Sequence, residues 1–137
     1  MSYLIDTNVI SELRRTSPEP DVVDWFSQRP ACSLFLSVLT LGEIRKGIEK
    51  LKDKHQQIQL LDWLENDLLI FFSGRILSID SAVADRWGRL VAGAGRTVSA
   101  IDSLLAATAV EHDLILITRN IKDVEGLAVT TYNPWQQ

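Results

Sequence analysis

Four carboxylates in this sequence are spaced so that they could meet in one site: Asp6, Glu43, Asp102 and Asp123. Carboxylates brought together repel one another by about 1 kcal/mol per pair in water, so a cluster persists when a cation lies among them. Oxygen ligands suit Mg²⁺ or Mn²⁺ rather than zinc. We therefore predict a Mg²⁺ (or Mn²⁺) site, with one or two ions, that activates a water and neutralises the charge of a phosphodiester.

Asp6 ends the apolar run Tyr3-Leu4-Ile5, and two explanations fit that position. It is either the N-cap of the helix that follows or a ligand at the end of a strand, and cap statistics alone favour the cap. Thr7 and Asn8 can also cap a helix, and one helix needs only one such residue. We expect Thr7 or Asn8 to cap the helix, which leaves Asp6 for the site.

Asp102 lies in "VSAIDSLLAATAV", residues 98–110, where the other polar residues are only Ser and Thr. A helix that is apolar nearly all round is buried, and a carboxylate there is unfavourable unless it is paired or binds a metal. No Lys or Arg occurs between Arg96 and Arg119. We predict that Asp102 is a metal ligand inside a helix over residues 98–112. The alternative is an Asp in the first turn of a helix that begins later.

Glu43 borders the apolar stripe of a predicted helix over residues 38–51, beside the small residues Thr40 and Gly47. A glycine inside a helix costs about 1 kcal/mol relative to alanine, which indicates that space is needed at Gly47. We predict that Glu43 faces the site. The alternative is a solvated glutamate on the helix surface.

Asp123 lies just beyond a predicted strand over residues 114–118, where Thr118 and Asn120 are small polar neighbours. Side chains that follow a strand end are well placed for a site in a parallel sheet. The alternative is a loop aspartate that caps a short turn.

Other kinds of catalysis have less support. His55 and His112 are the only histidines, and His112 lies near a predicted helix C-terminus, where the dipole favours it as a structural residue. The single Cys32 has no histidine motif beside it, which argues against a zinc site or a thiol nucleophile. A phosphatase with an aspartyl nucleophile would carry Asp-x-Asp here, but the sequence reads Asp6-Thr7-Asn8.

Short apolar runs alternate with helical segments along the chain. Strands are predicted over residues 2–5, 32–37, 75–79, 114–118 and 128–132, and helices over 8–15, 21–28, 38–51, 55–70, 82–93 and 98–112. Strands that are apolar on both faces and separated by helices indicate a parallel sheet covered on both sides. We predict an α/β fold, with a parallel sheet of four to five strands flanked by helices on both faces.

The composition fits one domain over residues 1–137, with a hydrophobic fraction of 46% and 23% charged residues. One cysteine, no signal-peptide pattern and no apolar run long enough for a membrane span lead us to expect a cytoplasmic protein. The net charge of −4 lowers the expectation of a domain that binds DNA by itself.

Four motifs in order resemble one known family: "LIDTNVIS", the segment around Glu43, "SAIDSLLAATA" and "LITRNIKDVEGL". They are similar to the PIN domain and, more narrowly, to the VapC-type ribonuclease toxins of bacterial toxin–antitoxin modules. The similarity extends over almost the whole chain, including the closing "YNPW".

The resemblance implies a Mg²⁺- or Mn²⁺-dependent endoribonuclease that is inhibited by a small antitoxin bound over the active site. It also implies a homodimer, and binding of operator DNA only through the antitoxin, which would supply the basic surface that this acidic chain lacks. By position, Asp6, Glu43 and Asp102 match the acidic residues of the family. Small polar residues that line the family's site match Thr7 or Asn8, and Thr118.

The fourth acidic position of the family falls on Asn120 in some members and on Asp123 in others. Only Asp123 is acidic here, so we assign it, with Asn120 as a residue that could bind a metal-bound water or hold Asp6. In the mechanism that follows as a hypothesis, a metal held by Asp6 and Asp102 polarises a water. Glu43 and Asp123 position the ion and accept the proton. The products carry a 5′-phosphate and a 3′-hydroxyl, and Arg119, Lys122 and Arg14 are candidate phosphate contacts.

Two further functions remain open. One is a non-catalytic PIN-like module that acts through dimerisation and an antitoxin partner in transcriptional regulation; such a degenerate site should have lost Asp6, Glu43 or Asp102, and none is lost. The other is a metal-dependent phosphatase or DNA nuclease that uses the same carboxylates.

Overall fold

A computed structural model describes residues 1–136, so that Gln137, the last residue of the predicted domain, lies outside the described residues. Within this described range, five short parallel strands form one sheet in the order β3-β2-β1-β4-β5. The strands are β1 (Tyr3–Ile5), β2 (Leu34–Ser37), β3 (Ile76–Leu77), β4 (Ile115–Ile117) and β5 (Thr131–Tyr132). The predicted α/β fold with a parallel sheet is confirmed.

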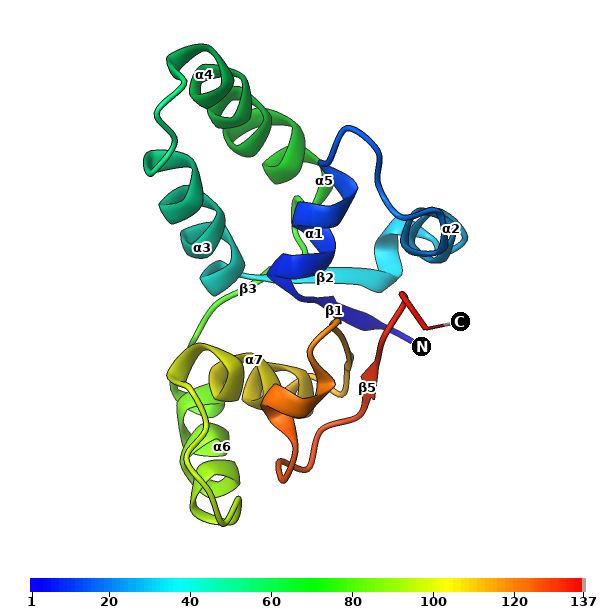
Figure 1. Cartoon of the computed structure of the whole chain (residues 1–137). Coiled ribbons are helices and arrows are strands. Elements are labelled where there is room, and N and C mark those ends of the chain that lie inside the picture. Colours follow the sequence, from blue (N-terminus) through cyan, green and yellow to red (C-terminus); the bar gives the residue numbers. More distant parts are fainter. Residues whose placement is uncertain (137) are drawn as a thin grey trace.

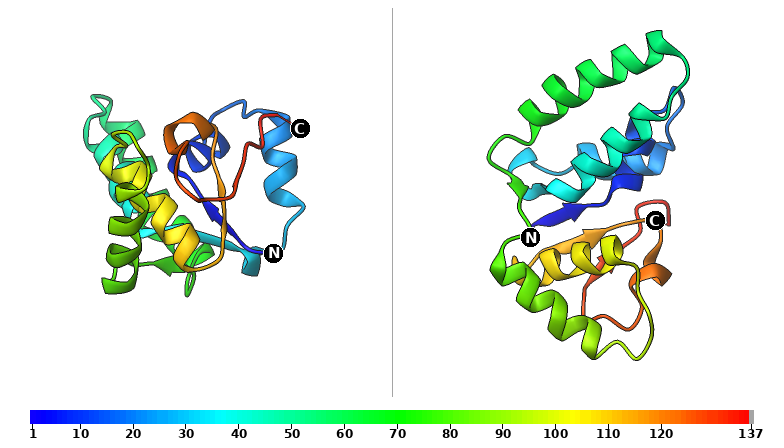
Figure 2. Two further views of the ribbon diagram at one scale, coloured as in Figure 1. Left: turned by 90° about the horizontal axis from the view of Figure 1, so that it is seen from below. Right: turned by 90° about the vertical axis from the view of Figure 1, so that its left-hand side faces the viewer.

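Helices cover both faces of the sheet (Figures 1 and 2). On one side lie α1 (Thr7–Leu13), α2 (Pro20–Ser27), α3 (Val38–Glu49), α4 (Lys54–Asp62) and α5 (Leu69–Phe71), and on the other α6 (Ser81–Ala92) and α7 (Ala100–Glu111). Two 3₁₀ turns, η1 (Ala31–Ser33) and η3 (Ile121–Val124), and a π-helical segment, η2 (Trp63–Leu68), complete the described chain.

Alternation along the central strands divides the core into two layers. Ile5 of β1 and Ile117 of β4 pack into one buried cluster, while their neighbours Leu4 and Leu116 pack into the other. Successive side chains of a strand point to opposite faces, so both faces of β1 and β4 need a cover of helices. No helix within residues 1–136 is long and apolar enough to span a membrane.

The order in which the chain adds strands to the sheet changes side at β1. It passes from β1 outward to β2 and β3, then returns to place β4 on the other side of β1. Ligands of open parallel sheets bind beyond the carboxyl ends of the strands at such a switch point. The backbone N–H of Asp6 donates to the carbonyl oxygen of Ile117 at 2.9 Å, so Asp6 lies at this edge, between β1 and β4.

The predicted elements are present, but one boundary differs in a way that concerns the site. The helix predicted over residues 98–112 begins at Ala100 and has Ser99 as its N-cap. Asp102 therefore lies in the first turn of α7 and not in the middle of a buried helix. The buried stretch of α7 begins one residue later, at Ser103.

Candidate active site

Asp6 is held at the carboxyl end of β1 by three contacts. Its side chain accepts hydrogen bonds from the backbone N–H of Thr7 at 2.7 Å and from the hydroxyl of Thr118 at 2.7 Å, and Asn8 Nδ2 lies 3.5 Å away. The first of these contacts makes Asp6 the N-cap of α1. The expectation that Thr7 or Asn8 caps this helix was therefore wrong, since the cap and the candidate ligand are the same residue.

The surroundings of Asp6 disfavour its negative charge. Burial raises the pKa of the Asp6 carboxyl above its ordinary value, and the hydrogen bonds from Thr118 and Thr7 offset part of that rise. The carboxylates of Glu43 and Asp102 repel it and raise the same pKa further. A cation among these three groups would remove that repulsion, so the donor set fits a divalent ion.

Glu43 reaches the site from α3 through Thr7. Thr7 Oγ1 donates to Glu43 Oε1 at 2.6 Å, and the hydroxyl of the buried Thr40 lies 3.2 Å from that of Thr7. The predicted orientation of Glu43 toward the site matches its place in the structure. A hydroxyl that donates to one carboxylate oxygen leaves the other free to face a ligand.

Asp102 is held in place by the cap of its own helix. Ser99 Oγ donates to Asp102 Oδ2 at 2.6 Å, and the backbone N–H of Asp102 donates to Ser99 Oγ at 3.2 Å. This is close to the reciprocal arrangement of a capping box, with Asp at the third helical position. The spacing Ser-x-x-Asp before an apolar run is the sequence signal for this helix start.

One cavity of about 460 Å³ brings most of the predicted residues together. Its lining includes Asp6, Thr7, Asn8, Glu43, Asp102, Asn120 and Arg119, together with Ser11, Glu12, Arg15 and Trp135. Asp123 is exposed on η3 and is not among the lining residues, whereas the nearby Asn120 is. Thr118 is buried behind Asp6, where its hydroxyl also accepts from the backbone N–H of Asn120 at 3.2 Å.

The three candidate ligands in this cavity, Asp6, Glu43 and Asp102, have no basic partner within residues 1–136. None of the ion pairs formed within residues 1–136 involves Asp6, Glu43 or Asp102. In the same part of the chain no three acidic, histidine or cysteine side chains lie close enough to enclose an ion as they stand. Mg²⁺ commonly keeps several waters and uses one or two carboxylates, so a smaller set of carboxylates is compatible with such an ion.

Four residues of the cavity wall were not predicted from the sequence: Ser11, Glu12, Arg15 and Trp135. Glu12, 4% exposed, accepts from the backbone N–H of Glu19 at 2.9 Å and pairs with Arg15 at 3.2 Å, so it anchors the loop after α1. Trp135 has the guanidinium of Arg119 5.1 Å from its ring centre. Only the closing "YNPW" pointed to Trp135, and nothing in the sequence distinguished Glu12 from a surface residue.

Solved structures with this architecture include three that match nearly the whole chain. The fold matches FitAcB from Neisseria gonorrhoeae with a TM-score of 0.94 and 35% identity, over 98% of this chain and 99% of that one. It matches FitAB bound to an IR36 DNA fragment with a TM-score of 0.93 and 33% identity, over 98% and 96%. A toxin–antitoxin complex from Klebsiella pneumoniae matches with a TM-score of 0.71 and 28% identity, over 97% and 98%.

Sequence comparison leads to the same group. The chain is 36% identical to toxin FitB of Neisseria gonorrhoeae, over 96% of this chain and 97% of the relative. It is 31% identical to the VapC ribonuclease Y4jK of Sinorhizobium fredii, over 97% of each. The PIN domain model matches residues 3–124. With the fold, the carboxylates and these relatives in agreement, the chain belongs to the PIN domain family and, within it, to the VapC-type toxins.

Proposed function

We propose that this protein is a Mg²⁺- or Mn²⁺-dependent endoribonuclease and the toxin of a type II toxin–antitoxin module. One observation carries the proposal: Asp6, Glu43 and Asp102 share one cavity beyond the ends of β1 and β4 with no basic partner among the described residues. The relative named as a VapC ribonuclease supports RNA as the substrate.

Asp6 and Asp102 are the residues that would hold the divalent ion, with Glu43 beside them. Bound there, the ion would neutralise charge on the phosphodiester and lower the pKa of a coordinated water. The bonds from Thr7 and Thr118 keep the Asp6 carboxylate in one orientation. A fixed orientation lowers the entropy lost when the ion and the substrate bind.

The remaining wall of the cavity suits the substrate. Glu43 keeps one carboxylate oxygen free of Thr7 and is placed to accept a proton from the attacking water. Arg15 and Arg119 bring positive charge to the same cavity and are suited to contact phosphate oxygens. Asp123 stays a proposed contributor that acts from outside the cavity lining, together with Asn120 inside it.

Partners follow from the complexes of the relatives. We propose that a small antitoxin binds over the cavity and that operator DNA is bound only through that antitoxin, since this chain has a net charge of −4. The FitAB structure with a DNA fragment and the toxin–antitoxin complex from Klebsiella pneumoniae support this arrangement. A homodimer is part of the same proposal.

Regulated expression in bacteria tests the proposal with two variants. Wild type should arrest growth and deplete RNA, while Asp6→Asn should do neither. Asp80→Asn makes the same change at the exposed N-cap of α6, far along the chain from the site, and should behave as wild type. Purified wild type should lose RNA cleavage in EDTA and regain it with Mg²⁺ or Mn²⁺. Cleavage by Asp6→Asn at the wild-type rate, or undiminished cleavage in EDTA, would refute the metal-dependent nuclease.

The non-catalytic alternative is separated by the same pair of variants, since it predicts equal effects of wild type and Asp6→Asn on growth and transcription. A DNA nuclease or a phosphatase is separated by competition: unlabelled RNA should suppress cleavage of labelled RNA, while DNA oligonucleotides and phosphomonoesters should not.

A further inference from the structure

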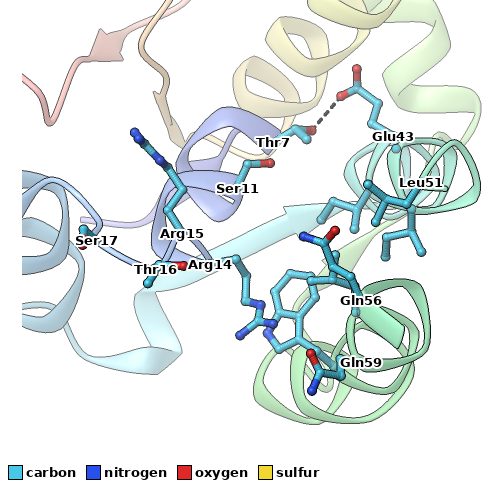
Figure 3. Close-up of a pocket in the computed structure, with 15 residues that line it drawn as sticks. Thr7, Ser11, Arg14, Arg15, Thr16, Ser17, Glu43, Leu51, Gln56 and Gln59 are labelled. Carbon is cyan, nitrogen blue, oxygen red and sulfur yellow. Dashed lines mark hydrogen bonds between the residues drawn. The ribbon is translucent and has the colours of Figure 1, made fainter. Parts of the chain in front are cut away.

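A groove of about 800 Å³ opens beside the acidic cavity, between α1, α3 and α4 (Figure 3). Thr7 and Glu43 line both spaces, so the hydrogen bond between them forms part of the shared wall. Figure 3 shows this bond at one end of the groove and Arg14, Gln56 and Gln59 toward the other. A chain that crosses the carboxylates can therefore continue directly into the groove.

Several polar groups in the groove have no hydrogen-bond partner within residues 1–136, and those of Arg14 and Gln56 are exposed to solvent. The guanidinium of Arg14 forms no hydrogen bond or ion pair within residues 1–136 and lies 5.1 Å from the ring centre of Trp63. In the same described range, the side-chain amide of Gln56 and the indole N–H of Trp63 form no hydrogen bond. Exposed donors and acceptors that line a groove can bond to a polar ligand in place of water.

The helix backbone becomes irregular at Trp63, the aromatic residue that lines the groove. Trp63 is the first residue of the π-helical segment η2, which continues directly from α4. A π-helical turn contains one residue more than an α-helical turn, changes the direction of the side chains that follow, and frequently occurs at functional sites. The irregular turn therefore coincides with the one tryptophan of this groove.

The charges and shapes in the groove suit a nucleotide. Its charged lining residues are Arg14, Arg15 and Glu43, so it is more basic than the acidic chain as a whole. Unpaired RNA bases are bound by stacking on aromatic rings and arginine planes and by hydrogen bonds to their edges, for which glutamine amides are suited. Trp63, Arg14 and Gln56 supply these three kinds of contact.

We propose that this groove is a nucleobase subsite that binds one unstacked base of single-stranded RNA next to the cleaved phosphate and so gives the enzyme its sequence preference. This inference rests on the proposed ribonuclease activity and deepens it. On binding, Arg14 moves from the ring of Trp63 to the adjoining phosphate, Trp63 stacks on the base in its place, and Gln56 bonds to the edge of the base.

Gly47 provides a test that does not depend on removing a core contact. It lines the groove on α3, and a Cβ built there meets nothing within 4 Å. Gly47→Leu should therefore fill the groove without straining the helix. Gly88 on α6 is also helical and exposed and has the same open surroundings, so Gly88→Leu is the matched control.

The probe is a pool of single-stranded RNA oligonucleotides of random sequence, and the product ends are read by sequencing. Wild type and Gly88→Leu should share one base preference at a position beside the cut. Gly47→Leu, Gln56→Ala and Trp63→Ala should lose that preference. We expect kcat/KM on the best substrate to fall about 5- to 150-fold for Trp63→Ala, the range of one base–aromatic stack, mostly through KM. Melting temperatures control for folding, and Trp63→Phe, which keeps a stacking surface, should retain most of the activity.

The outcomes separate this inference from the function on which it rests. Wild type that cleaves no RNA would overturn both. Wild type that cleaves without any base preference, or groove variants that keep the wild-type preference and KM, would overturn the subsite alone. Groove variants that lose binding of an inhibitory protein but cleave as wild type would assign the groove to that protein and also overturn the subsite.

Discussion

Replacing Asp6 by asparagine should separate the stability of this protein from its activity. Asparagine is as good an N-cap as aspartate, and its side-chain oxygen can still accept from the N–H of Thr7. The change removes the unfavourable burial of a charge, the largest cause of the raised pKa, and also the repulsion by Glu43 and Asp102, worth up to about 1 kcal/mol for each pair at high dielectric. It also weakens one charge-assisted hydrogen bond from Thr118, a loss of about 1 kcal/mol. We expect the free energy of unfolding at pH 7 without metal to rise by zero to about 1 kcal/mol.

The pH dependence of this difference has a definite sign. The pKa of Asp6 is raised in the folded state, so near its titration the folded protein binds more protons than the unfolded chain. Stability therefore falls as pH rises from the unfolded pKa to the folded one. Asp6→Asn has no carboxyl group at this position, so its stability does not fall in this way as pH rises. The two proteins should be about equally stable below the unfolded pKa, and the variant should gain its advantage as pH rises through that window.

Divalent ions should make wild type more stable than Asp6→Asn, which is the reverse of the order expected without metal. An ion at a hundred times its dissociation constant stabilises the form that binds it by about 2.7 kcal/mol. For a domain of this size that is about 10 °C in melting temperature. Thermal unfolding of wild type, Asp6→Asn and Asp80→Asn in EDTA and in increasing Mn²⁺ or Mg²⁺ provides the measurement. Wild type and Asp80→Asn should gain stability with the ion, and Asp6→Asn should not.

Two results would contradict this reasoning. Equal stabilisation of all three proteins by the ion would place the ion away from Asp6. A loss of stability in Asp6→Asn without metal would mean that the carboxylate contributes more as a partner of Thr118 than it loses by burial and repulsion.

Three further changes test the supports of the site. Ser99→Ala removes the cap of α7 and the hydroxyl bonded to Asp102, so we expect about 1 kcal/mol less stability by chemical denaturation and slower RNA cleavage; unchanged values for both would show that the cap does not position Asp102. Glu12→Gln should lower the melting temperature at pH 7, because the backbone N–H of Glu19 and the Arg15 side chain hold the pKa of Glu12 below its usual range. That contribution is present above the unfolded pKa and is lost as pH falls through the folded pKa, so wild type and variant should converge in acid. Asp123→Asn should slow cleavage, but by less than Asp6→Asn does in the same assay, because its exposed carboxylate lies outside the cavity lining.

The sheet and its helices could be predicted because each depends on a local pattern. Runs such as Leu114–Ile117 are apolar on both faces, and such runs in alternation with helices leave few arrangements other than a covered parallel sheet. The start of α7 could not be read in this way, because Val98 and Ser99 fit a helical pattern although Ser99 is its cap. Hydrophobic periodicity locates the body of a helix better than its first residue.

Contacts between distant segments account for what the sequence could not predict. Glu12 is buried because the loop after α1 turns back so that the N–H of Glu19 meets its carboxylate. Trp135 reaches the cavity because Asn133 bonds both to the carbonyl of Arg119 and to the N–H of Trp135. No spacing of residue types along the chain encodes these approaches, since the first depends on the course of the loop after α1 and the second on where β4 and β5 bring the tail.

The capping contact of Asp6 strengthens the case for its role in the site. As a cap alone, Asp6 could be Ser or Asn without loss, because each offers an oxygen to the N–H of Thr7. A neutral residue would also avoid the repulsion from Glu43 and Asp102 that raises the pKa of Asp6. The cap therefore explains how the side chain is fixed at the edge of β1 and β4, but it does not explain the negative charge. That charge is an advantage only when something positive, such as a divalent ion, is bound beside it.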